Sequence, residues 1–319
     1  MSRTPQQPAV DRAIRAVVML VIVAAAGYLG WAGYLGWREL SSAALRLGLA
    51  AIATGLALAS CNYLLRYLRW RDLLQRLGHP VPDRDGLRVY LAGLALTATP
   101  GKSGETIRSA LLLRWQVPVS ASLTAFVVDR LTDVIGVLLL AALSGSAPLW
   151  WVLAALAAGA GLAVRSLCRT SFAAEAAAWL ESRRWTSLGR LLRAGMQHYA
   201  TAWRLDRIAV YVGIAILAYG VQALAFAWFA LRLWPEAQWH DSVHVYATST
   251  LAGAASLLPG GLGAMEIALI AQMTVRGMPL SDATVAALAV RAVTLWFAIF
   301  LGLACLLWYR RHGSEPTHS

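Results

Sequence analysis

Two short runs rich in proline and glycine decide how this chain folds: LTATPGKSGE at residues 96–105 and SLLPGGLGAME at residues 256–266. Each lies inside a longer apolar stretch, at 87–116 and 244–276. Proline removes a backbone donor and glycine permits sharp bends, so a regular helix is broken at both runs. Inside a membrane, such a break is tolerated only where it is buried in protein or faces a wet cavity. Both runs are therefore expected to be broken, buried elements.

The chain as a whole has the composition of a membrane protein. Of its 319 residues, 59% are apolar and 14% are charged, whereas soluble domains have about 45–50% apolar and about 25% charged residues. Most soluble-enzyme folds are thereby excluded. The net charge of +12 comes from arginines between apolar segments, which indicates contact with anionic lipid and not with nucleic acid. The cysteines Cys61, Cys168 and Cys305 lack the spacing of a disulfide framework or metal site.

Six further apolar runs are long enough to cross a bilayer. They are residues 14–36, 43–65, 119–143, 147–164, 208–231 and 282–308. Each broken stretch either crosses with a kink or enters the membrane and returns as a re-entrant hairpin. The re-entrant arrangement places residues 66–88, 165–207 and both termini on one side, which then carries most of the 28 Lys and Arg residues. The positive-inside rule favours this arrangement and makes that side cytoplasmic.

The two broken stretches resemble copies of each other. One proline, two glycines and a later arginine recur in the same order: Pro100, Gly101, Gly104 and Arg130, then Pro259, Gly260, Gly263 and Arg291. We predict an all-α polytopic membrane protein, a single membrane domain over 1–319, with six spanning helices and two re-entrant helical hairpins. The hairpins belong to inverted-topology repeats at 14–143 and 147–308. This architecture is typical of secondary transporters.

A basic connector, residues 165–207, lies within the second repeat. It contains eight arginines together with tryptophan, leucine and alanine. This composition suits amphipathic helices on an anionic cytoplasmic leaflet. A solvated connector between the repeats is an equal alternative.

Charged side chains inside apolar segments are costly and therefore mark candidate functional positions. Here they are Lys102, Glu105, Arg108, Asp129, Arg130, Asp133, Glu266 and Arg291. Asp129 and Asp133 share a helix face, and Arg130 is close enough in sequence to pair with Asp133. This group is either an internal ion pair or a switchable site, in which Arg130 contacts a lipid phosphate and an aspartate carries a proton.

Arg291 differs from Arg130 because it has no counter-charge nearby in the sequence. Val290 and Thr294 stand where the aspartates flank Arg130. A guanidinium inside a membrane needs a carboxylate or phosphate partner. Glu266 and Glu105 are the protein candidates, and a lipid headgroup is the favoured partner.

The hairpin tips are a second predicted anion site. A helix that restarts after Pro100 or Pro259 presents free backbone N–H groups at mid-depth in the membrane. The tip glycines are Gly101, Gly104, Gly260 and Gly263. Lys102 either adds a positive charge there or extends to the cytoplasmic interface. The GKS string is not expected to bind nucleotide, because the first glycine of that motif is replaced by Leu96.

The sequence contains no motif for nucleophilic catalysis or dinucleotide binding. His240 and His244 have a spacing that suits metal ligands on a helix, but no third ligand is apparent. We therefore predict no cofactor, no metal site and no catalytic residues.

The chain resembles the lysylphosphatidylglycerol synthase transmembrane family, also described as flippase-like, in four segments: TPGKSGETIRSALLL, ASLTAFVVDRLTDVIGVLLL, LLPGGLGAMEIALI and AALAVRAVTLWFAIFLGL. The resemblance covers most of the chain and implies that it binds or translocates lipids in a bacterial cytoplasmic (inner) membrane. Full-length synthases of the family carry an additional aminoacyl-transferase domain. That domain is missing from this sequence, so the resemblance does not imply synthase activity.

The expected function is a flippase that moves a lipid with an anionic or phosphate-containing headgroup, of the phospholipid, glycolipid or isoprenoid-phosphate type. One alternative is an accessory subunit that holds a lipid for a lipid-modifying enzyme. A further alternative is an intramembrane transferase or hydrolase that uses Asp129, Asp133 or Glu266. The expected partners are membrane lipids, a lipid-modifying enzyme in the accessory case and, on base rates, a second copy of the chain.

Overall fold

The computed structural model describes residues 37–95, 97, 107–183 and 185–312, with single residues at 15, 19, 23, 26, 27 and 30. These residues are mainly helical, and none of them lies in a β-strand. The prediction of an all-α protein is thus confirmed for this part of the chain. Most of the predicted span 14–36 falls outside the described residues. The same holds for five residues of the first hairpin: Pro100, Gly101, Lys102, Gly104 and Glu105.

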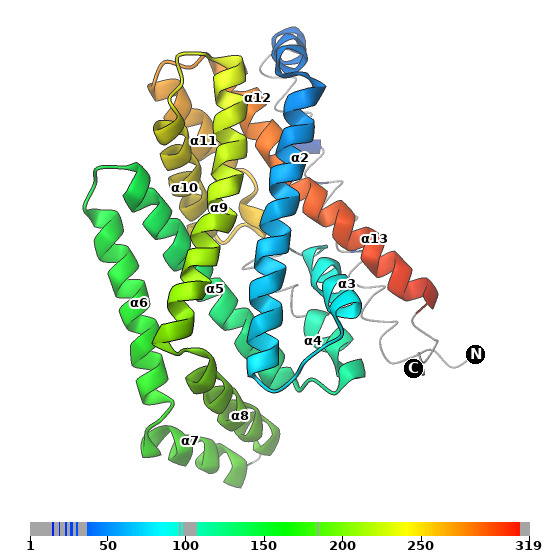
Figure 1. The fold of residues 1–319 in the computed structure, drawn as a ribbon, viewed down its shortest axis with the longest axis vertical. Helices are drawn as coiled ribbons and strands as arrows, with labels where there is room; N and C mark the ends of the chain where they lie inside the picture. The colour runs from blue at the N-terminus through cyan, green and yellow to red at the C-terminus, as the bar shows by residue number, and fades with distance from the viewer. Residues whose placement is uncertain are drawn as a thin grey trace.

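Long helices form the body of the molecule (Figure 1). They are α2 (Trp37–Arg76), α5 (Val119–Ser144), α6 (Leu149–Leu167), α9 (Leu205–Leu233), α12 (Leu280–Arg291) and α13 (Phe297–His312). Helices α2 and α9 pack side by side, with α5 and α6 to one side of them and α13 to the other. A π-helical turn at Ala292–Trp296 joins α12 to α13.

The other described helices fill three regions around these. They are α3 (Asp83–Leu94), α4 (Ile107–Leu112), α7 (Ser171–Ser182), α8 (Thr186–Ala202), α10 (Trp239–Ala255) and α11 (Ala264–Val275). In Figure 1, α10 and α11 pack together in the upper half, and α3 and α4 pack together in the lower half. Helices α7 and α8 lie at the lower end, transverse to the long helices.

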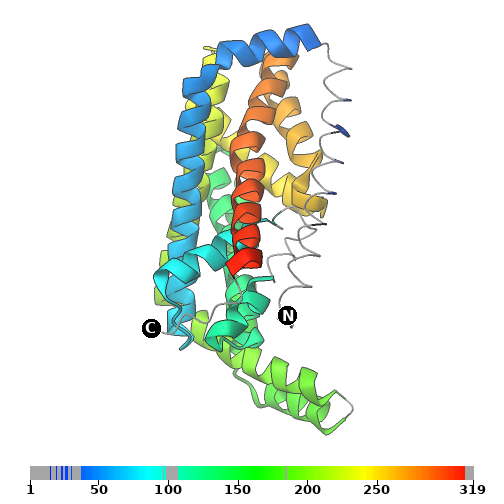
Figure 2. The same cartoon turned by 90° about the vertical axis from the view of Figure 1, so that its right-hand side faces the viewer.

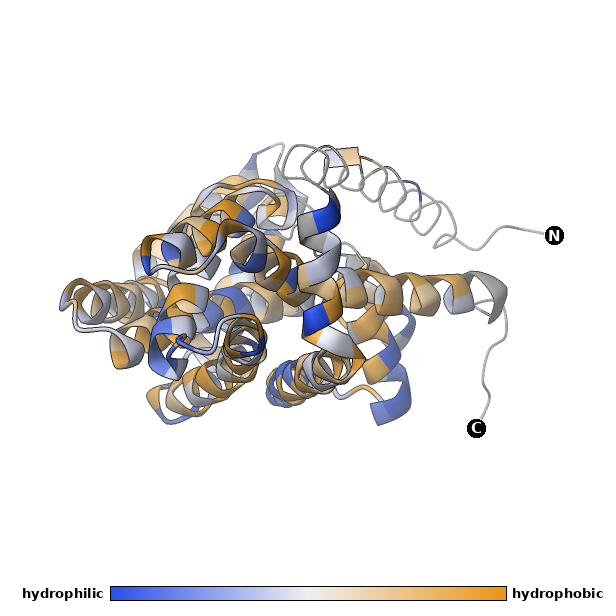
Figure 3. Cartoon of the chain, turned by 90° about the horizontal axis from the view of Figure 1, so that it is seen from above, coloured by the Kyte–Doolittle hydropathy of each residue, from blue (hydrophilic) through white to orange (hydrophobic). Residues whose placement is uncertain are grey.

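Four helices are long and apolar enough to cross a membrane: Ser41–Arg76, Leu149–Leu167, Leu205–Leu233 and Leu280–Tyr309. They coincide with four of the six predicted spans. Seen from above, hydrophobic residues (orange) are spread widely over the described helices (Figure 3). The predicted span 119–143 is also a helix, α5. It is not among these four candidate spans, and it carries three charged residues, Asp129, Arg130 and Asp133, near its middle. The chain is therefore a membrane protein.

The predicted end of the second span, at residue 65, is wrong. Helix α2 continues to Arg76, so residues 66–76 are not part of a loop as expected from their charge. Arg66 and Arg69 are buried inside the bundle. The error has a physical reason: the many arginines after residue 65 suggest contact with water, whereas these two side chains find their counter-charges on a neighbouring helix.

Two hydrophobic cores meet near the middle of the molecule. Trp70 and Tyr90 belong to the lower core, and Phe226 and Phe229 belong to the upper core. Polar side chains gather between the two cores, around a cavity that draws its lining from both. The fold thus brings charged groups together near the middle of the molecule, between two apolar cores.

The turn between α10 and α11 depends on glycine. Gly260, Gly261 and Gly263 have φ angles of 60°, 65° and 81°, a region that costs other residues about 1–2 kcal/mol. Gly261 also approaches α10 closely, because a Cβ atom placed on it would lie 3.1 Å from the Cα and carbonyl oxygen of Gly253. The backbone at this break is therefore fixed by both conformation and packing.

A Gly261→Ala variant is expected to unfold at a clearly lower temperature than the unmodified protein. The positive φ costs about 1–2 kcal/mol, and crowding against Gly253 adds typically about 1–3 kcal/mol. Gly213→Ala is the matched control, since this residue lies within α9 and a Cβ there meets nothing within 4 Å. Thermal unfolding of both variants in detergent tests the difference, and equal unfolding temperatures would contradict the packing described here.

Candidate functional site

A buried charge cluster joins α2 to α5. Asp129 and Asp133 lie one turn apart on α5, and Arg69 of α2 bridges them with Nη2 at 2.6 Å from an oxygen of each carboxylate. Arg66 Nη2 lies 2.9 Å from Asp133. Arg130 Nη2 lies 3.1 Å from Asp129 and 3.2 Å from Asp133. We call these five residues the α2–α5 charge cluster.

The α2–α5 charge cluster contains one more cation than anion. Three guanidinium groups share two carboxylates. Exposure differs within the cluster, since the side chain of Arg69 is 1% exposed and that of Arg130 is 19% exposed. The Tyr219 hydroxyl donates to Asp133 Oδ2 at 3.3 Å. Arg69 thus holds the aspartates, while Arg130 is the more accessible source of positive charge.

Arg66 and Arg69 were not predicted as site residues. Both were assigned to the segment after the second span, although their spacing of three residues places them on one face if the helix continues. A signal was present, because two aspartates inside a span need more counter-charge than Arg130 supplies. The structure places that counter-charge on α2.

A second buried ion pair lies at the break between α10 and α11. Arg291 Nε donates to Glu266 Oε1 at 2.8 Å, and Arg291 Nη2 donates to the Gly260 carbonyl at 2.7 Å. Arg291 Nη1 also contacts the Met265 sulfur at 3.4 Å. Glu266 is one of the two protein partners considered from the sequence. The helix that carries Arg291 is thereby tied to the glycine turn. We call Arg291 and Glu266 the α11–α12 ion pair.

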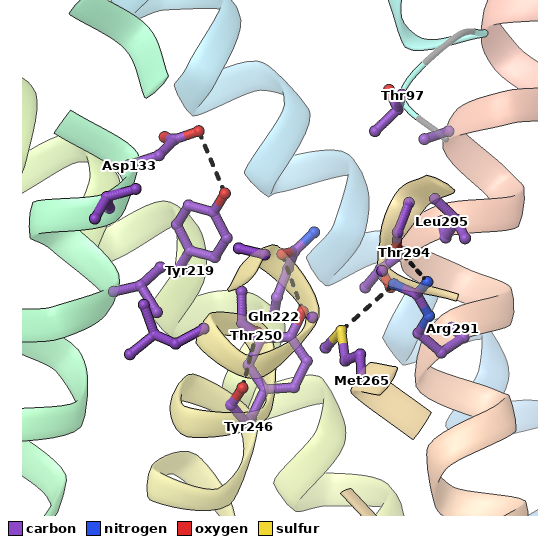
Figure 4. Close-up of a pocket in the computed structure, with 18 of the residues that line it drawn as sticks. Thr97, Asp133, Tyr219, Gln222, Tyr246, Thr250, Met265, Arg291, Thr294 and Leu295 are labelled. Carbon is purple, nitrogen blue, oxygen red and sulfur yellow. Dashed lines mark hydrogen bonds between the residues drawn. The ribbon is translucent and has the colours of Figure 1, made fainter. Parts of the chain in front are cut away.

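The two charged groups face the same cavity, which has a volume of about 230 Å³. Arg66, Arg130 and Asp133 line it from the α2–α5 charge cluster, and Arg291 and Gly260 line it from the other break. Asp133 and Tyr219 lie on one side in Figure 4, with Arg291 and Met265 on the other. The positions predicted to be equivalent, Arg130 and Arg291, thus meet at one site.

Hydroxyl and amide groups complete the cavity lining between the two charged sides. They come from Tyr63, Tyr219, Gln222, Tyr246, Thr250 and Thr294. The Tyr246 hydroxyl donates to Gln222 Oε1 at 3.1 Å, and the Tyr63 hydroxyl donates to the Thr294 carbonyl at 2.5 Å. A cavity with arginines and several hydroxyl groups can bind a phosphate together with polar substituents.

Arg108 lies apart from this cavity. Its guanidinium is buried, stacks 4.1 Å from the Tyr90 ring centroid and donates to the Tyr90 carbonyl at 3.1 Å. The Trp70 ring centroid is 5.8 Å away. The contacts of Arg108 with these aromatic residues hold α4 against α3. Leu94 and Thr97, at the end of α3, do line the cavity.

Several other predicted site residues lie behind the lining. Asp129 and Glu266 do not line the cavity themselves, but they contact Arg130 and Arg291, which do. Gly263 precedes α11 and has a positive φ angle.

His244, which was considered as a metal ligand, contacts the Ala141 carbonyl through Nδ1 at 3.1 Å. Within 37–95, 97, 107–183 and 185–312, no group of three or more His, Cys, Asp or Glu residues could hold a metal ion.

The chain matches a known protein family. The family model described as "Lysylphosphatidylglycerol synthase TM region" matches residues 16–302. No curated protein matches the chain at a significant level. The matched range includes every residue that lines the cavity and both proline-glycine runs.

Proposed function

Because this chain belongs to the lysylphosphatidylglycerol synthase transmembrane family, we propose that it is a transporter that moves lipids with an anionic or phosphate-containing headgroup across a bacterial cytoplasmic membrane. The family match confirms the resemblance seen in the sequence and fits a lipid-related function in the membrane. The observation that carries the proposal is the cavity, where Arg66, Arg130 and Arg291 gather between apolar helices.

The arrangement of the broken elements supports a transporter with inverted repeats. Helices α3 and α4 approach the cavity from the lower end in Figure 1, and α10 and α11 approach it from the upper end. Leu94 and Thr97 from the first pair, with Gly260 and Gly261 from the second, line the same cavity. Two hairpins that enter from opposite sides and meet at mid-depth are characteristic of alternating-access transporters.

The lower end of the molecule is proposed to face the cytoplasm. It carries the end of α2, the start of α3 and residues 165–207, which together contain many of the arginines. The positive-inside rule places such segments in the cytoplasm. The termini follow on the same side in this topology, as predicted from the sequence.

The proposed mechanism compensates for the cost of moving a charged headgroup into the membrane. The headgroup enters the cavity, where the excess positive charge of the α2–α5 charge cluster offsets the loss of water. Arg291 then exchanges part of its contact with Glu266 for a phosphate oxygen, since both ligands suit a guanidinium. The acyl chains stay in the bilayer, and the hydroxyl groups of the cavity bind polar substituents of the headgroup.

The mechanism requires no covalent step. The carboxylates of Asp129, Asp133 and Glu266 each contact an arginine, which suits a positioning role. We therefore propose that these acidic residues hold the arginines in place and do not act as catalytic acids or bases.

Reconstitution in liposomes tests the proposal. We expect the protein to speed the exchange between leaflets of a fluorescent phosphatidylglycerol well above the protein-free rate, and to move a phosphatidylcholine analogue more slowly. The measurement is the fraction of fluorophore that an impermeant reductant quenches with time. A rate equal to that of empty liposomes for both headgroups would contradict transport.

A further inference from the structure

The hairpin formed by α7 and α8, residues 171–202, has a defined position relative to the membrane-spanning helices. It is inserted between α6, which ends at Leu167, and α9, which begins at Leu205, and both helices are candidate spans. The α7–α8 hairpin therefore starts and ends at the same level. Figures 1 and 2 show it at the lower end of the bundle, at an angle to the long helices and projecting beyond them.

Side-chain contacts fix the end of the α7–α8 hairpin to α6. The Tyr199 hydroxyl donates to the Gly161 carbonyl at 3.3 Å, and Arg165 Nε donates to the Ala200 carbonyl at 3.3 Å. Trp203 is fully buried and stacks on Tyr199 with ring centroids 5.6 Å apart. These contacts lie within the last two turns of a candidate span, so they hold α8 at the surface level of the bilayer.

The two helices of the hairpin pack through a narrow contact face. A Cβ atom on Gly189 would lie 2.8 Å from the Ala177 carbonyl oxygen, so the backbones approach closely there. Arg193 Nε also donates to Glu181 Oε1 at 3.0 Å. Because this contact uses small residues and one ion pair, the large apolar side chains of both helices remain outside it.

Those large apolar side chains form exposed stripes. On α7, Phe172 and Trp179 are 69% and 59% exposed and lie with Ala176 at helical spacing. On α8, Trp185 is 62% exposed, and Leu188 and Leu192 continue its stripe. Contiguous exposed apolar residues of this kind indicate an interaction site.

Positive charge surrounds the stripes. Residues 165–207 contain eight arginines against three acidic residues, and Arg169, Arg183, Arg190 and Arg204 are exposed. We propose that the α7–α8 hairpin lies on the cytoplasmic leaflet, with its aromatic side chains among the acyl chains and its arginines on anionic headgroups. A second copy of the chain fits this surface less well, because it would bring like charges together. This membrane contact does not depend on the transport activity proposed above.

Two exposed alanines of α7 provide a matched test of the orientation. Ala176 lies within the stripe of Phe172 and Trp179, whereas Ala178 lies on nearly the opposite side of the helix. A nitroxide label is placed at either position in the full-length protein after Cys61, Cys168 and Cys305 are replaced with alanine. The labelled protein is reconstituted in bilayers of phosphatidylcholine with phosphatidylglycerol, and in phosphatidylcholine alone.

The proposal predicts that the ratio of oxygen accessibility to nickel-chelate accessibility is several-fold higher at Ala176 than at Ala178 in the anionic bilayer. It also predicts that this difference decreases in phosphatidylcholine alone. Equal ratios at the two positions in the anionic bilayer would overturn the proposal. Shielding of the Ala176 label from both reagents would also overturn it, in favour of a protein partner or a second copy. Spin–spin interaction between labels on two copies of the chain is checked by diluting the labelled protein with unlabelled protein.

Discussion

An Arg69→Met variant is expected to lose about 3–5 kcal/mol of unfolding free energy, because removing one partner of a buried ion pair is strongly destabilising. Arg69 is the arginine that lies closest to both Asp129 and Asp133, at 2.6 Å from each. Its loss leaves two carboxylates with two guanidinium groups, neither of which bridges them as closely. Denaturant titration of the purified protein in mixed micelles measures the loss.

Arg71→Met is the matched control for this prediction. Arg71 lies two residues further along α2 and pairs with Asp83 at 2.7 Å, but both side chains are substantially exposed. Exposed ion pairs contribute about 0–1 kcal/mol. The account therefore requires a large difference between the two variants, and equal losses would show that burial of the α2–α5 charge cluster does not determine its contribution.

Arg291→Met alone is expected to destabilise the protein by a similar amount, about 3–5 kcal/mol, because Glu266 is buried and loses the cation that contacts Oε1. Replacing both members of the α11–α12 ion pair with methionine is expected to recover most of this stability. Methionine has a volume close to that of glutamate and fills irregular spaces well, and apolar replacement of a whole buried pair is often neutral or stabilising. Unfolding of both variants in mixed micelles compares them.

A double variant that unfolds as readily as Arg291→Met would contradict this explanation. In that case the contact from Arg291 to the Gly260 carbonyl, at 2.7 Å, would be the stabilising one, since the double variant lacks it as well. The comparison therefore separates the contribution of the ion pair from that of the tie to the glycine turn.

Much of the fold is predictable from the sequence because apolar length is a strong signal. Four of the predicted spans coincide with candidate membrane helices, and the break at 256–263 is correctly marked by Pro259 and its following glycines. The glycines at this break have positive φ angles, which is the property that makes glycine informative at such a position. The basic connector contains the helices α7 and α8, which are compatible with both alternatives considered from the sequence.

The pairing of charges is less predictable, since it depends on contacts between residues far apart in the chain. Charge inside a span identifies Asp129, Asp133 and Arg291 as unusual, but it does not reveal that Arg69 bridges the aspartates. The sequence also favours a headgroup as the partner of Arg291, whereas the structure pairs it with Glu266. Long-range packing of α2 on α5, and of α11 on α12, decides these partners.

The transport rate of the double variant Arg291→Met, Glu266→Met tests whether arginines at the cavity bind the headgroup during transport. This variant is expected to keep most of the stability of the fold, but it removes one of the two charged sides of the cavity. We expect the reconstituted double variant to move phosphatidylglycerol no faster than protein-free liposomes. A rate equal to that of the unmodified protein would contradict a role of Arg291 in transport and leave the α11–α12 ion pair with a structural role alone.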